Sequence, residues 1–94
     1  MVKHIVMWKI SAPDKEQAAQ KIKQMLESLN GKIPGLYKAE VGINITPGGY
    51  DVVLYSELED QKALEGYQVH PEHLAVKEYI TSVTCGRASA DYLL

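Results

Sequence analysis

The sequence predicts a single α+β domain spanning residues 1–94, with strands and helices in the order β-α-β-β-α-β. Three observations support this class. Segments with alternating apolar and polar residues, typical of strands, occur at the start, in the middle and at the end of the chain. Segments with helically spaced apolar residues separate them, and each follows a capping residue. No linker, repeat or low-complexity segment divides the chain.

The first strand is expected from Lys3 to Ile10. One face would carry His4, Val6, Trp8 and Ile10, and the other Lys3, Ile5, Met7 and Lys9. Large apolar groups lie on both faces. We assign the face that contains His4 to the helix side, because a histidine on a covering helix could then reach it.

Ser11 to Asp14 supplies turn and capping residues for the first helix. Apolar residues then recur at helical spacing: Ala18, Ile22, Met25, Leu26 and Leu29. The pair Asn30-Gly31 ends this run. The pattern indicates an amphipathic helix with one buried stripe.

Two middle strands are predicted to form a hairpin. The stretch from Leu36 to Ile45 alternates, with Tyr37, Ala39, Val41, Ile43 and Ile45 on one face and Lys38, Glu40 and Asn44 on the other. The loop Thr46 to Gly49 lacks the lysine and helix start of a phosphate-binding loop, so we interpret it as a turn. A strand from Tyr50 to Leu58 follows.

The C-terminal part begins with Asp60, which can cap a short helix to about Tyr67. A second helix starts at Pro71 and is expected to end near Ile80. The last strand is expected from Ser82 to about Tyr92.

This order corresponds to the ferredoxin-like arrangement, a four-stranded antiparallel sheet with the first and third strands in the centre and helices on one face. The opposite face would be open in a monomer. Ile5, Met7, Val53 and Tyr55, or their counterparts on the other face of the same strands, would form an apolar patch there, and such patches mark association surfaces. We therefore predict a homodimer in which sheet packs against sheet.

Composition excludes several function classes. The 10 basic and 12 acidic residues are spread without runs, so neither nucleic acid nor an anionic membrane is an expected partner. The single cysteine, Cys85, cannot form an internal disulfide, and we interpret it as a buried thiol without an activating neighbour apart from Arg87. The apolar run at the N-terminus is too short for a signal peptide, which favours a cytosolic (cytoplasmic) protein.

The segment Tyr67-Gln-Val-His-Pro-Glu-His73 concentrates the proton-transfer groups of the chain. Pro71 suits the first helical position, so His73 falls in the first turn, where the helix dipole favours the neutral imidazole of a general base. Spacings of three and seven place it on the same helical face as Val76 and Ile80. Two interpretations stay open: a base in a cavity, or a core histidine bonded to a carbonyl or to His4.

His4 and Tyr67 have two interpretations each. His4 would orient His73 or donate a hydrogen bond to a substrate oxygen, or else be structural. Tyr67 is either an oxyanion donor or a core aromatic residue. His70 precedes a proline, so it should be extended and structural. A metal shared by His4, His70, His73 and Glu72 is not favoured, because His-x-x-His lacks the i, i+4 spacing of helical zinc ligands. No cofactor is expected.

The chain resembles the stress-responsive dimeric α/β-barrel (Dabb) family over nearly its whole length. The resemblance is carried by five segments: Val2-Lys-His-Ile-Val, Ile33-Pro-Gly35, Tyr50-Asp-Val-Val-Leu, Tyr67 to His73, and Ala90-Asp-Tyr92. It implies a dimeric barrel. Members include plant stress-induced proteins and a plant polyketide cyclase that closes a linear tetraketide into an aromatic acid. The wider superfamily contains monooxygenases, haem-degrading enzymes and lactone isomerases, so fold alone leaves function open.

In that cyclase, the residues matching His4, Tyr67 and His73 line the active cavity, whereas Leu26 stands where the cyclase has a tyrosine. The resemblance thus implies a general pocket more than a particular substrate. We expect a small, largely apolar carbonyl compound as ligand, with proton transfer of a cyclase, lyase or isomerase type and His73 as base. The alternatives are a non-catalytic stress-response or ligand-binding module, and cofactor-independent or haem-linked oxygen chemistry.

Overall fold

The computed structural model describes residues 1–94 and contains four strands and three helices. These are β1 (Val2–Ile10), α1 (Lys15–Glu27), β2 (Leu36–Ile43), β3 (Val52–Leu58), α2 (Gln61–Val69), α3 (Pro71–Val83) and β4 (Thr84–Leu93). The strands form one antiparallel sheet in the order β2-β3-β1-β4, so β1 and β3 are central as predicted. None of the helices is long and apolar enough to cross a lipid bilayer.

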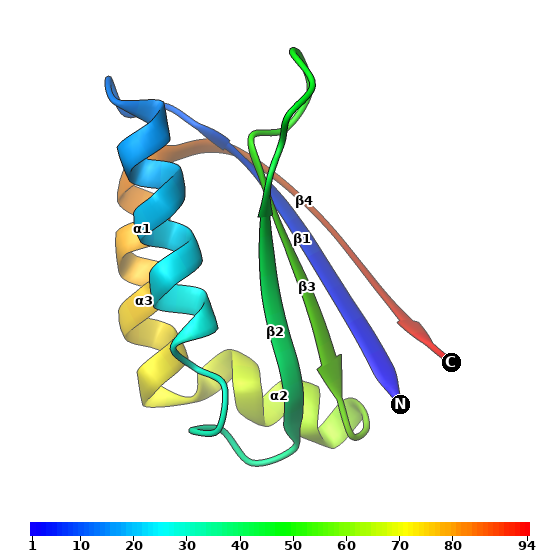
Figure 1. Ribbon diagram of the computed structural model, residues 1–94. Coiled ribbons are helices and arrows are strands. Elements are labelled where there is room, and N and C mark those ends of the chain that lie inside the picture. Colours follow the sequence, from blue (N-terminus) through cyan, green and yellow to red (C-terminus); the bar gives the residue numbers. More distant parts are fainter.

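The helices cover one face of the sheet and leave the other uncovered (Figure 1). We call these the covered face and the open face. Helices α1 and α3 lie side by side on the covered face, and α2 runs across the end of the sheet near the start of β2 (Figure 1). The chain ends are neighbours, since the Leu94 amide donates to the Met1 carbonyl at 3.0 Å.

The alternation of β1 is confirmed by burial. Its even-numbered residues, from Val2 to Ile10, are buried under the helices, whereas Ile5 and Met7 are half-buried on the open face. The predicted helix starts are also confirmed. Asp14 accepts a hydrogen bond from the Gln17 amide at 3.0 Å, and Asp60 accepts one from the Ala63 amide at 2.8 Å.

The second strand differs from its prediction in two ways. A register shift against β3 between Leu36 and Lys38 turns Tyr37 outward, where it is 58% exposed, while Leu36 and Ala39 are buried. The strand also ends at Ile43. Asn44 holds the following loop by donating to the Tyr50 carbonyl at 2.7 Å, and Ile45 is 96% exposed.

Smaller differences concern the ends of other elements. β3 begins at Val52, two residues later than expected, and α3 continues to Val83, three residues beyond Ile80. The extension is stabilised because Val83 packs against the core and its carbonyl accepts a hydrogen bond from the Ser11 amide at 2.8 Å. As a result, β4 starts at Thr84.

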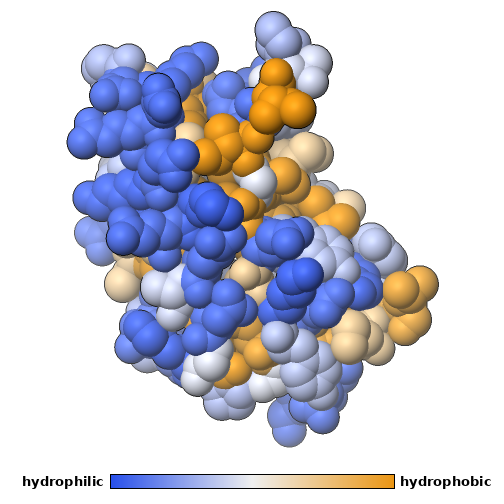
Figure 2. All heavy atoms as spheres, viewed as in Figure 1, coloured by the Kyte–Doolittle hydropathy of each residue, from blue (hydrophilic) through white to orange (hydrophobic).

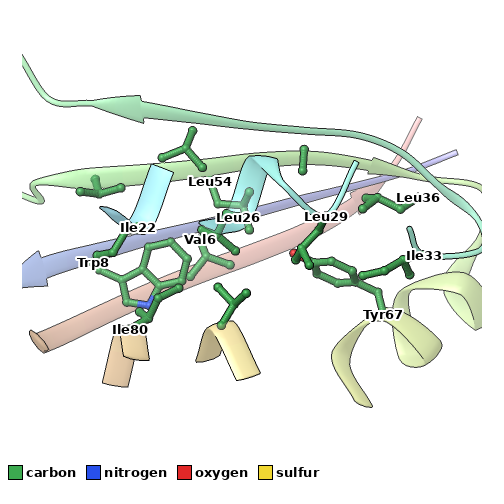
Figure 3. Close-up of a cluster of buried hydrophobic side chains, with 14 of the residues drawn as sticks. Val6, Trp8, Ile22, Leu26, Leu29, Ile33, Leu36, Leu54, Tyr67 and Ile80 are labelled. Atoms are coloured by element: carbon green, nitrogen blue, oxygen red, sulfur yellow. The ribbon is translucent and has the colours of Figure 1, made fainter. Parts of the chain in front are cut away.

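One hydrophobic core lies between the helices and the covered face, and Figure 3 shows part of it. Ile22 and Leu26 of α1 and Leu54 of β3 are almost completely buried in it. The outer face of α1, on the left in Figure 2, is hydrophilic, and hydrophobic atoms emerge beside it over the strands. The α1 helix is thus amphipathic, with its apolar stripe against the sheet.

Candidate functional site

A cavity of about 730 Å³ lies between α3 and the strands β1 and β4. This volume is within the range of small-molecule sites. Its walls combine aliphatic, aromatic, hydroxyl and basic side chains: His4, Val6, Trp8, Leu54, Gln68, Val69, His73, Leu74, Lys77, Ile80, Thr81, Thr84, Cys85, Gly86 and Arg87. Two of the predicted site residues, His4 and His73, therefore line the same space.

His73 reaches this cavity from the first turn of α3 and is half-buried. Its Nδ1 lies 3.4 Å from the Gln68 carbonyl oxygen. A carbonyl can only accept, so Nδ1 carries the proton and Nε2 has the free lone pair. Burial lowers the pKa of His73 below its usual 6.5, and the positive charges of Lys77 and Arg87 and the nearby His4 add to this effect. His73 is therefore a neutral imidazole at pH 7.

His4 enters the cavity from β1 and is only 4% exposed. Its Nδ1 is hydrogen-bonded to Asp91, which faces it directly across the β1–β4 ladder. The carboxylate accepts, so Nδ1 carries the proton here as well. A carboxylate bonded to one ring nitrogen fixes the orientation of the imidazole. It also determines whether the other nitrogen carries a proton or a free lone pair.

Tyr67 lies beside both histidines but does not line the cavity. Its ring centroid is 4.3 Å from that of His73, and 6.0 Å from that of His4 in an edge-on arrangement. The side chain is fully buried, and its hydroxyl has no hydrogen-bond partner. Figure 3 shows the hydroxyl directed into the apolar core. Burial raises the pKa of Tyr67 to about 12, so the phenol is neutral.

Of the remaining candidates, only Cys85 lines the cavity. His70 is the N-cap of α3, and its Nδ1 accepts a hydrogen bond from the Glu72 amide at 3.1 Å outside the cavity, in the structural role expected. Leu26 belongs to the core, not to the cavity wall. Cys85, expected to be buried, is exposed and lines the cavity, because β4 has no covering element there. No three histidine, cysteine or acidic side chains are grouped to hold a metal ion.

Sequence reasoning missed three residues at this site: Asp91, Lys77 and Arg87. Lys77 follows His73 by four residues, so helical spacing could have found it. Arg87 and Asp91 stand opposite Trp8 and His4 in the β1–β4 ladder. That pairing joins strands from the two ends of the chain, and its register is interrupted between Lys9 and Ile10. No local pattern in the sequence gives this register.

Comparison with known families decides the classification. The sequence pattern of the stress-responsive A/B barrel domain, Dabb, matches residues 2–94. The chain belongs to the Dabb family. No protein with a curated description is similar enough in sequence to be matched.

Two dimeric ferredoxin-like proteins of unknown function are similar to this Dabb domain. The one from Bacteroides fragilis is 35% identical, with a TM-score of 0.91, and the match covers 99% of this chain and 95% of the other. The one from Thermobifida fusca is 22% identical, with a TM-score of 0.87, and covers 99% and 90%. The ferredoxin-like fold of the Dabb domain is therefore shared with dimeric proteins.

More distant structures with the same fold include enzymes. A hydroxynitrile lyase from Passiflora edulis is 14% identical with a TM-score of 0.84, covering 99% of this chain and 92% of that one. A putative antibiotic biosynthesis monooxygenase from Nitrosomonas europaea is 17% identical with a TM-score of 0.82, covering 100% and 98%. At these identities the likeness concerns the fold, which supports unrelated chemistries.

Proposed function

We propose that this Dabb domain binds a small, largely apolar carbonyl compound in the cavity under α3 and transfers a proton on it. One observation carries the proposal. His4 and His73 line the same cavity, and each uses Nδ1 in a hydrogen bond to the protein, which leaves its Nε2 for a ligand. Two imidazoles held in this way offer a base and a hydrogen-bonding partner at one site.

In the proposed reaction, Nε2 of neutral His73 removes a proton from the carbon next to the ligand's carbonyl group. The electrons of the C–H bond move to the carbonyl oxygen and form an enolate. When His4 carries a second proton, on Nε2, it donates a hydrogen bond from there to this oxygen, while its Nδ1 stays bonded to the Asp91 carboxylate. The proton on His73 then returns to carbon, or the enolate carbon attacks a second carbonyl group and the alkoxide that forms takes up this proton.

Tyr67 has a positioning role in this proposal. Its ring packs against His73 and contacts the edge of His4, so it holds the two imidazoles at a fixed separation. The hydroxyl supports this role and not that of an oxyanion donor, since it is buried among apolar side chains and Tyr67 does not line the cavity.

The test is exchange of the α-protons of butyrophenone in D₂O, followed by proton NMR. We expect the wild-type protein to exceed buffer, and His73→Ala to fall to the buffer rate. The matched control is His70→Asn, which changes a histidine outside the cavity and keeps a capping side chain. The proposal is rejected if wild-type protein does not accelerate exchange or if His73→Ala retains its rate. Binding without exchange would instead assign the alternative, a ligand-binding module.

We also propose that two copies pair through the open face. Four half-buried residues carry its apolar area: Ile5, Met7, Val53 and Tyr55. Beside them Lys3 donates to Glu57 and to the Tyr55 hydroxyl, each at 2.7 Å, so the charges of Lys3 and Glu57 neutralise each other. Apolar area with neutralised charge suits burial against a second copy.

Light scattering coupled to size-exclusion chromatography tests this pairing. The wild-type protein should elute as a dimer, and Met7→Asp should yield a monomer because it places a charge in the centre of the contact. Ile45→Asp, in the exposed loop between β2 and β3, serves as the control and should remain dimeric. A monomeric wild type, or a dimeric Met7→Asp variant, contradicts the proposal.

A further inference from the structure

The charge of the cavity differs from that of the whole protein. The chain has a formal net charge of −2, with 12 acidic residues. Yet the lining of the cavity contains Lys77 and Arg87 and no aspartate or glutamate. A space of mixed apolar and polar lining with two basic groups and no acidic group has a positive potential.

Neither basic group has an acidic partner within the protein. The ion pairs of the chain use Lys3, His4, Lys23 and Lys38. Arg87 makes one long hydrogen bond, to the Ser89 hydroxyl at 3.4 Å, which leaves most of its five donors unused. Lys77 makes none within the protein. Asp91, the acidic residue beside the site, is bonded to His4 and does not line the cavity.

Lys77 and Arg87 lie on opposite walls of the cavity, which has an apolar base. Lys77 lies one turn after His73 on α3, and Arg87 faces Trp8 across the β1–β4 ladder, so they approach from opposite walls. Both are exposed, whereas Val6, Trp8 and Ile80 at the base of the cavity are buried. Charge therefore lies at the outer part of the cavity and apolar surface at its base.

From this arrangement we infer that the ligands of this cavity combine an apolar body with a carboxylate, and that Lys77 and Arg87 bind the carboxylate. Guanidinium and ammonium groups form charge-assisted hydrogen bonds with a carboxylate, and the planar guanidinium can bind both of its oxygens. The inference rests on the cavity of the proposed function, but it does not require that proton transfer occurs.

Cys85 gives a direct measure of occupancy, because it is the only cysteine of the chain and lies in the same cavity. A ligand that fills the cavity should slow alkylation of this thiol by iodoacetamide, which is uncharged. The probes are octanoate, ionised at pH 7, and octanamide, which has the same apolar body without the charge. The dissociation constant of each follows from the concentration that halves the alkylation rate.

We expect octanoate to bind roughly tenfold more tightly than octanamide, the factor that one charge-assisted hydrogen bond typically supplies. Lys77→Gln and Arg87→Gln should each reduce this preference, and the double variant should abolish it. Lys62→Gln removes the same charge from α2, outside the cavity, and should keep the preference. Added salt should weaken octanoate alone.

The inference is overturned if the two probes bind equally, if neither protects Cys85, or if the preference for octanoate survives the double variant. These outcomes are separable from those of the ketone exchange experiment. Octanoate preference without ketone exchange rejects proton transfer and leaves the carboxylate site in place. Ketone exchange without a preference for octanoate rejects the carboxylate site and leaves the proposed proton transfer in place.

Discussion

The two long helices cover the same sheet in different ways. Helices α1 and α3 each contain 13 residues, but α1 fully buries four side chains whereas α3 buries only Val76 and Ile80. Under α1 the core is filled, and under α3 there is a cavity of about 730 Å³. The two helices lie side by side in Figure 1, so neighbouring parts of one sheet are covered differently.

The cause lies in the residues that face the sheet. Ala18 and Ala19 allow α1 to approach the strands closely, and Ile22 and Leu26 then fill the remaining space. On α3 the positions that line the cavity include His73 and Lys77, and the strand below the outer edge of α3, β4, has no buried residue. We conclude that the α1 half supplies most of the packing energy, while the α3 half leaves room for a ligand.

The largest expected effect is a difference in stability between matched leucine truncations in the two halves. Leu26→Ala in α1 should lower the free energy of unfolding by about 2–5 kcal/mol, because it leaves a hole in a closed core. Leu74→Ala in α3, at a residue that is 47% exposed and lines the cavity, should cost less than about 1 kcal/mol. Urea unfolding measures both, and equal costs would remove the distinction between the halves.

A medium effect is expected at Asp91. Asp91→Ala leaves the Nδ1–H of buried His4 without its acceptor, which should cost about 1–3 kcal/mol. Asp91→Asn keeps an acceptor oxygen and should recover most of that loss. Nitrogen-15 NMR of the histidine rings provides a second readout, since the proton should no longer be fixed on Nδ1 in the alanine variant. Full stability of Asp91→Ala would show that the pair is not structural.

A smaller effect is the pH dependence caused by His73. Its pKa is lowered in the folded protein, chiefly by burial, whereas an unfolded histidine titrates near 6.5. The unfolded state therefore binds more protons below about pH 6.5, and stability should fall as the pH drops from that value through the folded pKa. The unfolding free energy of His73→Gln should change less between pH 7 and pH 5 than that of the wild type.

The unfolding free energies should be compared above pH 5, because two glutamates add their own pH dependence at lower pH. Glu27 and Glu57 also have lowered pKa values, due mainly to hydrogen bonds from Lys23 and Lys3. Their contribution is lost when the pH falls below the unfolded value of 4.5, which would overlap the histidine effect. If wild type and His73→Gln respond identically between pH 7 and pH 5, His73 is not shielded from solvent in the folded protein.

The fold was predictable because its signals are local. Alternation in β1 and the caps Asp14 and Asp60 each involve residues close in sequence, and each is confirmed. The inward direction of His73 followed from helical spacing alone. Tyr37 was assigned to the wrong face because a register shift between strands depends on both partners and not on the pattern of one.

The site was less predictable because its main features depend on tertiary distances. The bond between Asp91 and His4 requires a particular register between β1 and β4, and a slip of one residue would turn Asp91 to the open face. The cavity depends on how far α3 stands from the strands. The position of Tyr67, buried behind the two histidines, depends on how α2 packs against β1. The strand register, the helix–strand distance and the packing of α2 cannot be predicted from residue spacing in the sequence.

The smallest expected effect concerns the polar contact that joins α1 to the edge strand of the packed half. Glu27 accepts hydrogen bonds from Lys23 at 2.8 Å and from the Val41 amide at 3.0 Å. Glu27→Gln keeps an acceptor for Val41 but loses the charge, and since the pair is about one third exposed the cost should stay below about 1 kcal/mol. The difference from wild type should shrink in high salt, and also as the pH falls from 4.5 through the lowered pKa of Glu27. A cost comparable to that of Leu26→Ala would mean that polar contacts, and not the filled core, hold α1 on the sheet.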